Sequence, residues 1–135
     1  MIDHTGITVS ELGRSRQFYE SVLSTLGYGV RLALEDAVGF GARELQPGDD
    51  PGGDFWISAG PPFTPRSHIA FRAHSEAQVV AFHQAALSAG GSDNGAPGLR
   101  PQYHARYFAA FVLDPDGYNI EAVFHGAAPA VADKA

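Results

Sequence analysis

Hydrophobic and polar positions along residues 4–27 first alternate and then follow a longer period. The alternation separates polar or small side chains from apolar ones, with His4, Gly6 and Thr8 on one face and Ile7 and Val9 on the other. A period of two is typical of a strand that buries one face. From about Ser10 the apolar residues recur at helical spacing, at Leu12, Phe18 or Tyr19, Val22, Leu23 and Leu26. The pattern predicts a strand followed by an amphipathic helix.

The same order recurs 64 residues further along the chain, without a gap. Residues 4–27 and 68–91 share 5 identities in 24 positions. In the second unit His68 opens an alternating strand, and Ser75 with Gln78 forms a capping box. The expected apolar stripe of this helix is Val79, Phe82, Ala86 and Leu87, and Gly90-Gly91 is expected to end the helix in a left-handed cap. The recurrence predicts two modules of one design.

Strand-like segments follow each helix. They are residues 29–35, 37–43 and 54–60 in the first unit, and residues 105–113 and 118–125 in the second. One more short strand is expected within the Gly- and Pro-rich stretch 90–101, whose glycines indicate turns and lack the spacing of a phosphate-binding loop. The sequence Asp114-Pro115-Asp116-Gly117 predicts a type I turn between the last two strands. The predicted order is βαβββ, twice.

The two units are joined by a proline-rich linker, GPPFTPR, at residues 60–66. We therefore expect a single domain over residues 1–126, made of modules at about 1–60 and 67–126. Residues 127–135 carry small side chains without a pattern, and we expect this tail to be disordered.

Length and composition narrow the class of protein. The 135 residues suit one globular domain, and a net charge of −6 without a Lys/Arg cluster argues against nucleic-acid binding. No apolar run reaches the ~20 residues of a membrane span, and the N-terminus lacks the pattern of a signal peptide. The absence of cysteine excludes disulfides, thiol catalysis and zinc-thiolate sites. We expect a cytoplasmic protein that contacts neither nucleic acid nor membrane.

One carboxylate, Glu121, interrupts the otherwise apolar last strand. An ionised carboxylate is rarely buried without a partner or a metal ion. His4 and His68 occupy equivalent positions in the two units and point away from the apolar faces, so a pseudo-twofold arrangement would bring them together. With Glu121 they predict a 2-His-1-carboxylate site for a divalent metal ion. Separate roles stay open: a solvated His4, a core His68, and a Glu121 paired with Arg72 or Arg106.

The segment RPQYHARYF, residues 100–108, gathers basic and aromatic side chains before the last hairpin. His104 is a candidate general acid or base near neutral pH. Candidates for binding an anionic or phenolic substrate are Arg100, Tyr103, Arg106 and Tyr107. The alternative is a solvated loop whose tyrosines pack over the sheet. Trp56 is a further candidate for a pocket wall, although a strand Trp is more often core.

The segments HTGITVSELGRSRQFYESVLSTLGY, HIAF and DPDGYNIEAV together resemble the vicinal oxygen chelate superfamily, which includes glyoxalase I, fosfomycin- and bleomycin-resistance proteins and extradiol dioxygenases. The likeness extends from His4 to about His125. It implies an α+β fold in which two paired βαβββ modules form a cupped mixed sheet. In metal-binding members the cup holds a divalent ion (Fe, Mn, Ni or Zn) that chelates adjacent substrate oxygens. The ligand positions fall here on His4, His68 and Glu121.

Three departures bear on the activity that this resemblance implies. Glyoxalase I supplies a second glutamate from the last strand of its first module, and the corresponding segment here has no carboxylate after Asp54. Fosfomycin-type enzymes carry a threonine where Gly6 stands. Extradiol dioxygenases carry a tyrosine where Phe111 stands, although His104 and Glu121 fit their pattern. We therefore do not expect a strict glyoxalase I.

Two functional interpretations remain. The first is a metal-dependent lyase, isomerase or dioxygenase that acts on a small molecule with neighbouring oxygens. The second is a metal-free module that sequesters a ligand, as bleomycin-resistance proteins do. Retention of all three ligand types favours the enzyme. By fold analogy we expect a homodimer, with sites either within one chain or shared between chains.

Overall fold

The structure, a computed structural model, describes residues 1–126, and the predicted disordered tail lies outside these residues. The first module contains β1 (Thr5–Val9), α1 (Leu12–Ser24), β2 (Tyr28–Ala33), β3 (Ala37–Ala42) and β4 (Phe55–Ala59). The second contains β5 (His68–Arg72), α2 (Glu76–Ser88), β6 (Ser92–Leu99), β7 (Phe108–Leu113) and β8 (Asn119–Phe124). The predicted order βαβββ, twice, is confirmed.

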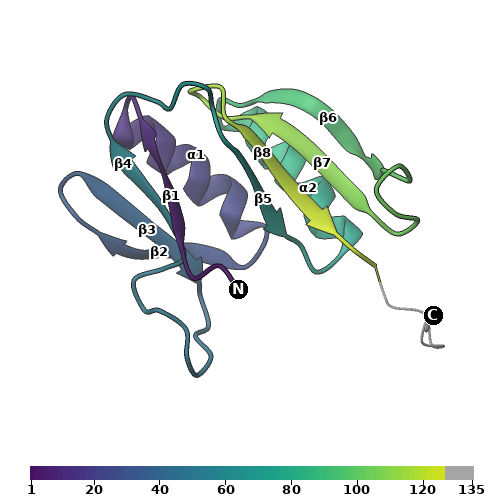
Figure 1. Cartoon of the computed structure of the whole chain (residues 1–135), viewed down its shortest axis with the longest axis horizontal. Coiled ribbons are helices and arrows are strands. Elements are labelled where there is room, and N and C mark those ends of the chain that lie inside the picture. The colour runs from purple at the N-terminus through teal and green to yellow at the C-terminus, as the bar shows by residue number, and fades with distance from the viewer. Residues whose placement is uncertain (127–135) are drawn as a thin grey trace.

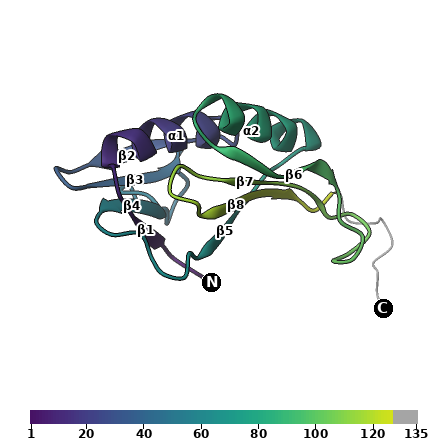
Figure 2. The same cartoon turned by 90° about the horizontal axis from the view of Figure 1, so that it is seen from above.

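Each module forms its own four-stranded mixed sheet (Figure 1), in the orders β1-β4-β3-β2 and β5-β8-β7-β6. β1 runs parallel to β4 and β5 parallel to β8, whereas the other neighbours are antiparallel. β1 and β5 are therefore edge strands, each with one side unpaired within its sheet. Figure 2 shows both helices on one side of the two sheets. The opposite side of the sheets, called the open face below, carries no helix among residues 1–126.

The two helices begin in different ways. The predicted capping box of α2 is present, because the N–H of Gln78 donates to the hydroxyl of Ser75 at 3.1 Å. The side chain of Gln78 returns to the N–H of His74 at 2.7 Å, one residue earlier than in the usual box. α1 starts after Glu11, which makes no side-chain cap. In the part of the chain that the structure describes, neither helix is long and apolar enough to cross a membrane.

The structure completes one predicted apolar stripe and corrects the other. Both Phe18 and Tyr19 are buried in α1, where the sequence left the choice open. In α2, Val79, Phe82 and Ala86 are buried, but Leu87 is 45% exposed. Adjacent positions of a helix point in different directions, so Leu87, which directly follows the buried Ala86, points away from the sheet. The prediction for Leu87 rested on its apolar character alone.

The Gly- and Pro-rich stretch of the second module forms more strand than its composition indicates. β6 spans Ser92–Leu99 and pairs with β7, with register shifts between Asp93 and Gly95 and between Gly95 and Gly98. The short strand expected within this stretch is confirmed. The interpretation of Gly95 and Gly98 as turn residues is wrong, whereas Gly90, with a φ of +101°, does lie in the turn that ends α2. Gly95 and Gly98 lie at the bulges of a strand, where an unpaired residue is tolerated.

One hydrophobic core joins the two modules. Buried side chains from both helices and from both sheets form a single cluster. Phe55 of β4 and Phe71 of β5 meet edge to face, with ring centroids 5.1 Å apart at an angle of 85°. A cavity of about 110 Å³ adjoins them, lined by Leu23, Tyr28, Phe40, Gly41, Asp54, Phe55 and Phe71. The modules therefore share apolar packing across their junction.

The predicted turn between β7 and β8 also joins the modules. The N–H of Gly117 donates to the carbonyl of Asp114 at 2.9 Å, as a type I turn requires. Oδ1 of Asp114 accepts the N–H groups of Asp116 and Tyr118, both at 2.9 Å, and Oδ2 accepts the hydroxyl of Tyr19 from α1 at 2.5 Å. Burial raises the pKa of Asp114. The pKa of the Tyr19 hydroxyl is raised as well, by its own burial and by Asp114.

Candidate functional site

Strands β5 and β8 bring His68 and Glu121 together. His68 lies opposite Asn119 in the parallel register, two residues before Glu121. The neighbours of Glu121 in β8 belong to the core, so Glu121 itself projects to the open face, where it is only 2% exposed. Nε2 of His68 lies 3.0 Å from Oε1 of Glu121. Within residues 1–126, Glu121 therefore forms its ion pair with His68 and not with the alternative partners Arg72 or Arg106.

The His68/Glu121 pair requires a positive charge between its two facing atoms. Nδ1 of His68 lies 2.8 Å from the carbonyl oxygen of Asn119. Because a carbonyl only accepts hydrogen bonds, Nδ1 carries a proton. In the neutral ring Nε2 then has no proton and presents a lone pair. That lone pair faces a carboxylate oxygen, which is also an acceptor. A proton or a metal ion resolves the conflict.

The pair fits the predicted metal ion as two of its ligands. Imidazole nitrogen and carboxylate oxygen suit the divalent ions Fe, Mn, Ni and Zn. The bond from Nδ1 of His68 to a backbone carbonyl is the usual support of a metal-bound histidine, since it presents Nε2 in the ligating tautomer.

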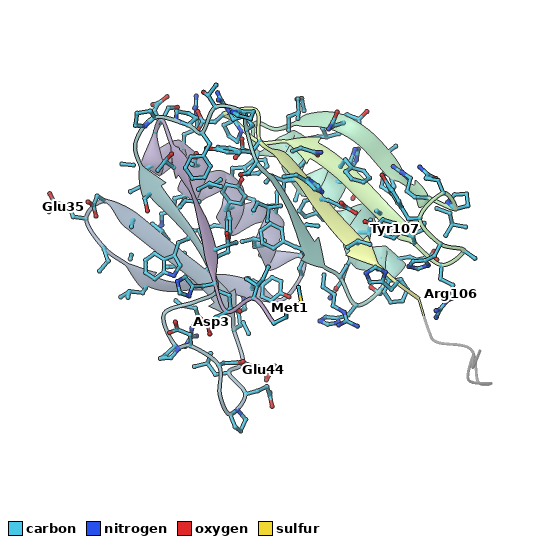
Figure 3. The ribbon with its side chains drawn as sticks, in the orientation of Figure 1. Met1, Asp3, Glu35, Glu44, Arg106 and Tyr107 are labelled. Carbon is cyan, nitrogen blue, oxygen red and sulfur yellow. The ribbon has the colours of Figure 1, made fainter. Side chains whose placement is uncertain are left out.

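Tyr107 completes the surroundings of the carboxylate. Its hydroxyl donates to Oε2 of Glu121, so each oxygen of Glu121 has a partner. Burial and this bond to Glu121 raise the pKa of Tyr107, and the phenol therefore stays protonated and able to donate. Figure 3 shows Tyr107 over the strands of the second sheet.

His4 lies apart from this pair. Its Nδ1 lies 2.6 Å from a carboxylate oxygen of Asp3, which leaves Nε2 directed elsewhere. Figure 3 shows Asp3 at the N-terminal end of the first module, well away from Tyr107. The hydrogen bond to Asp3, and its negative charge, raise the pKa of His4. No group of three His, Cys, Asp or Glu side chains within residues 1–126 is arranged to hold a metal ion.

Arg100 and Phe111 lie next to the His68/Glu121 pair. The guanidinium carbon of Arg100 lies 5.3 Å from the centre of the Phe111 ring. The rings of Phe111 and His68 are stacked, with centroids 6.2 Å apart and planes 25° apart. The three side chains thus form a continuous layer that ends at the pair.

The remaining candidates of the segment 100–108 form an aromatic group around Tyr107. Tyr103 contacts Tyr107 at 4.8 Å between ring centroids, and His104 contacts it at 5.4 Å. His104 accepts the backbone N–H of Arg106 on Nδ1 at 3.0 Å, and its Nε2 lies 3.0 Å from Nδ1 of His125. His104 therefore adjoins the residue that supports Glu121. Tyr103 and Arg106 are exposed at the rim.

Trp56 lies on the other module. Its indole N–H donates to the carbonyl of Gly53 at 3.3 Å, and its ring covers Gly39, where a Cβ would meet ring carbons at 2.6 Å. Trp56 alternates with the buried Phe55 and Ile57, so it is a half-buried part of the open face.

The sequence interpretation missed three contributors. Asn119 holds His68 through its carbonyl, Asp3 holds His4, and His125 pairs with His104. The side chain of His125 is exposed. A signal for it exists, because period-two alternation from Glu121 places His125 on the same face of β8. The carbonyl of Asn119 has no sequence signal, since every residue carries one.

The comparisons with known proteins agree with this architecture. The family model of the Glyoxalase/Bleomycin resistance protein/Dioxygenase superfamily matches residues 1–122. A search of the curated proteins gives no match. A glyoxalase/bleomycin resistance protein from Albidiferax ferrireducens is 28% identical, with a TM-score of 0.73 over 92% of this chain and 98% of that chain.

Two further solved structures share the fold at lower identity. A glyoxalase-related enzyme from Fulvimarina pelagi is 19% identical, with a TM-score of 0.69 over 98% of this chain and 94% of that one. The genomically encoded fosfomycin resistance protein FosX from Listeria monocytogenes is 18% identical, with a TM-score of 0.64 over 94% and 93%. The match of the family model over nearly all of the described residues is the decisive finding. This chain belongs to the Glyoxalase/Bleomycin resistance protein/Dioxygenase superfamily.

Proposed function

We propose that this protein is a divalent-metal-dependent enzyme, a lyase, isomerase or dioxygenase, that acts on a small molecule with vicinal oxygens. The observation that carries this proposal is the 3.0 Å approach of Nε2 of His68 to the buried carboxylate of Glu121. The tautomer of His68 makes both atoms acceptors, so the pair is suited to a cation. Membership of the superfamily supports the same interpretation.

In this proposal the third ligand, His4, comes from a second copy of the chain. His4 lies on the first module with Nε2 available, whereas His68 and Glu121 lie on the second. β1 and β5 are unpaired edges. In a homodimer with twofold symmetry, β1 of one chain would lie beside β5 of the other, and each site would use both chains.

The chain's own residues would prepare this site before any substrate arrives. A bound divalent ion would supply Lewis acidity and chelate two adjacent substrate oxygens. Tyr107 keeps the carboxylate of Glu121 oriented, and the carbonyl of Asn119 keeps His68 in the ligating tautomer. We assign substrate contacts to Tyr103, Arg106 and Tyr107 beside the pair, to Arg100 on Phe111, and to Trp56 on the open face of the first module.

His104 is our candidate for the general acid or base. Because Nδ1 of His104 accepts the N–H of Arg106, a further proton binds at Nδ1 only in exchange for this hydrogen bond, and the neutral ring carries its proton on Nε2. That nitrogen lies 3.0 Å from Nδ1 of His125, whose side chain is exposed. His104 can therefore act as a base by taking a substrate proton on Nδ1 while its Nε2–H stays bonded to His125, and as an acid by returning that proton.

Mixing two inactive variants tests the shared site. His4→Ala and His68→Ala would each bind little metal alone. Unfolded together and refolded, they form mixed dimers in which one site regains both histidines, so the sample should hold about one quarter of the wild-type metal content. Elemental analysis after reconstitution with Fe, Mn, Ni or Zn measures this. His83→Ala is the matched control, because His83 pairs with Asp93 outside the proposed site.

Other outcomes would reject parts of the proposal. If the wild type binds metal but the mixed sample does not, the complete site lies within one chain. A wild type that binds none of the four metals would favour a metal-free, ligand-sequestering module. The observation that favours testing this second function is that His4 lies apart from the His68/Glu121 pair within one chain. A cytoplasmic location belongs to the proposal, and the absence of cysteine supports it.

A further inference from the structure

Arg100 is held in one place by the backbone around it. Nη1 donates to the carbonyl of Gly98 and Nη2 to the carbonyl of Ala96, both at 2.8 Å. The backbone N–H of Arg100 donates to the carbonyl of Tyr107 at 2.7 Å. Two of its five side-chain N–H groups are used in this way, and three are left for a ligand.

Two glycines of β6 make room for the guanidinium. A Cβ added at Gly95 would meet Nη2 of Arg100 at 3.1 Å and the Phe111 ring at 3.0 Å, and a Cβ at Gly98 would meet Nη1 at 3.3 Å. Gly95 also has a φ of +150°, which side chains rarely adopt. The glycines of this stretch therefore leave room for the guanidinium over the Phe111 ring.

The charge of Arg100 has no counterion among residues 1–126. Its hydrogen bonds go to uncharged carbonyls, and no carboxylate in this part of the chain forms an ion pair with it. A half-buried, fixed cation one ring away from His68 is arranged for a negative charge that the described chain does not supply.

We propose that Arg100, lying on Phe111 beside the His68/Glu121 pair, binds an oxyanion group of the substrate, such as a carboxylate. The planar guanidinium fork matches a carboxylate in two parallel hydrogen bonds. The substrate class is therefore a small molecule that carries a carboxylate-type group besides its vicinal oxygens. This inference rests on the proposed function for the vicinal oxygens, but the anion site does not itself need the metal.

A set of three probes separates the two features. Catechol carries the vicinal oxygens alone, benzoate carries the carboxylate alone, and 3,4-dihydroxybenzoate carries both. Calorimetric affinities are measured with metal-loaded and chelator-treated full-length protein, for wild type and Arg100→Gln. We expect 3,4-dihydroxybenzoate to bind about 10-fold more tightly than catechol, with and without metal, and Arg100→Gln to abolish this preference. Arg100→Lys, which keeps the charge but loses the fork, should retain part of it.

Arg16→Gln is the matched control for loss of a positive charge. Arg16 lies on α1, on the helix side of the sheets, and pairs with Glu20 at 2.7 Å. It should leave the carboxylate preference unchanged, and far-ultraviolet circular dichroism should show that all three variants are folded.

The outcomes distinguish the anion site from the metal-dependent function. If Arg100→Gln keeps the wild-type preference, or if wild type has none, the anion site is rejected. If the preference depends on Arg100 but metal does not tighten catechol binding, the anion site stands and the metal-dependent function falls. An equal loss of preference in Arg16→Gln would also reject the anion site, because the effect would then come from net charge alone.

Discussion

Nε2 of His68 lies 3.0 Å from the buried carboxylate of Glu121, and the carbonyl bonded to Nδ1 of His68 makes both facing atoms acceptors. Two acceptors repel unless a cation lies between them, and either a proton on Nε2 or a metal ion supplies that cation. This relationship gives the proposed site a signature that can be tested without a known substrate.

Glu121→Gln should abolish metal binding and yet leave the metal-free protein at least as stable as wild type. The amide N–H₂ of glutamine can donate to Nε2 of His68 while its oxygen still accepts from Tyr107, so the variant needs no cation. We expect a gain of about 1 kcal/mol in the free energy of unfolding in chelator. Urea titration and elemental analysis measure the two effects. A variant that is clearly less stable would indicate that Glu121 serves as the anion of an ordinary ion pair.

Metal binding should depend on pH through His4. Asp3 raises the pKa of His4, so a proton competes with the metal to higher pH than at an ordinary histidine. Asp3→Asn removes the cause, lowers this pKa and should extend metal binding to lower pH. Above the pKa of His4, where the ring is neutral, the variant should bind up to about 10-fold more weakly because the ring loses its orienting carboxylate. Metal affinity measured below and above the pKa of His4 tests both the gain at low pH and the loss at high pH. An unshifted pH midpoint of metal binding would exclude His4 as a ligand.

Phe71→Ala should destabilise the first module as well as its own. Its ring packs against Phe55 of the other module at 5.1 Å, and we expect a loss of about 2–3 kcal/mol for this half-buried site. Trp56, the single tryptophan, reports the first module by fluorescence, and circular dichroism reports both. The denaturation midpoints measured by fluorescence and by circular dichroism should fall by the same amount. Leu87→Ala, at an exposed position of the second module, should change stability by less than about 0.5 kcal/mol. Separate midpoints would show that the modules unfold independently.

Two substitutions at Asp114 should act in opposite directions at neutral pH. Asp114→Ala leaves the buried hydroxyl of Tyr19 and two backbone N–H groups without their acceptor, at a cost of about 2–4 kcal/mol. Asp114→Asn keeps the acceptor oxygen for the backbone and removes a buried charge. Because burial raises the pKa of Asp114, the folded state binds the proton more readily than the unfolded state, and wild-type stability is lost as pH rises through this pKa.

The stability of Asp114→Asn relative to wild type should therefore improve between about pH 3 and about pH 7. Thermal unfolding at a series of pH values measures this difference. A difference that stays constant with pH would mean that the charge of Asp114 is fully compensated in the folded protein.

Gly95→Ala should imitate Arg100→Gln while keeping every charge. A Cβ at this position would lie 3.1 Å from Nη2 of Arg100 and 3.0 Å from the Phe111 ring, so the guanidinium must shift relative to Phe111. The preference for 3,4-dihydroxybenzoate over catechol should disappear. Gly13→Ala is the control, since nothing lies within 4 Å of its added Cβ, and as a helix substitution it should stabilise by about 0.5–1 kcal/mol. A preference retained in Gly95→Ala would argue that the position of Arg100 does not matter.

Much of the fold was predictable because its signals are local. The alternation after His4 and His68, the cap at Ser75 and the turn at Asp114 depend on residues a few positions apart, and each is present. Leu87 and the glycines Gly95 and Gly98 of β6 were misjudged for the same reason. Apolar character alone does not show on which face of a helix a residue lies, and a bulged strand rich in glycine has the composition of a loop.

By itself the sequence determined the order of the elements, the face on which Glu121 lies and the family resemblance, because periodicity and turn chemistry are written in short segments. Only the tertiary structure decided which side chains meet. The parallel register of β5 and β8 brings His68 to Glu121, and the bulges of β6 leave Arg100 over Phe111. His4, just before β1 of the first module, lies apart from them. These contacts join residues tens of positions apart, and their geometry depends on how strands pair and sheets pack.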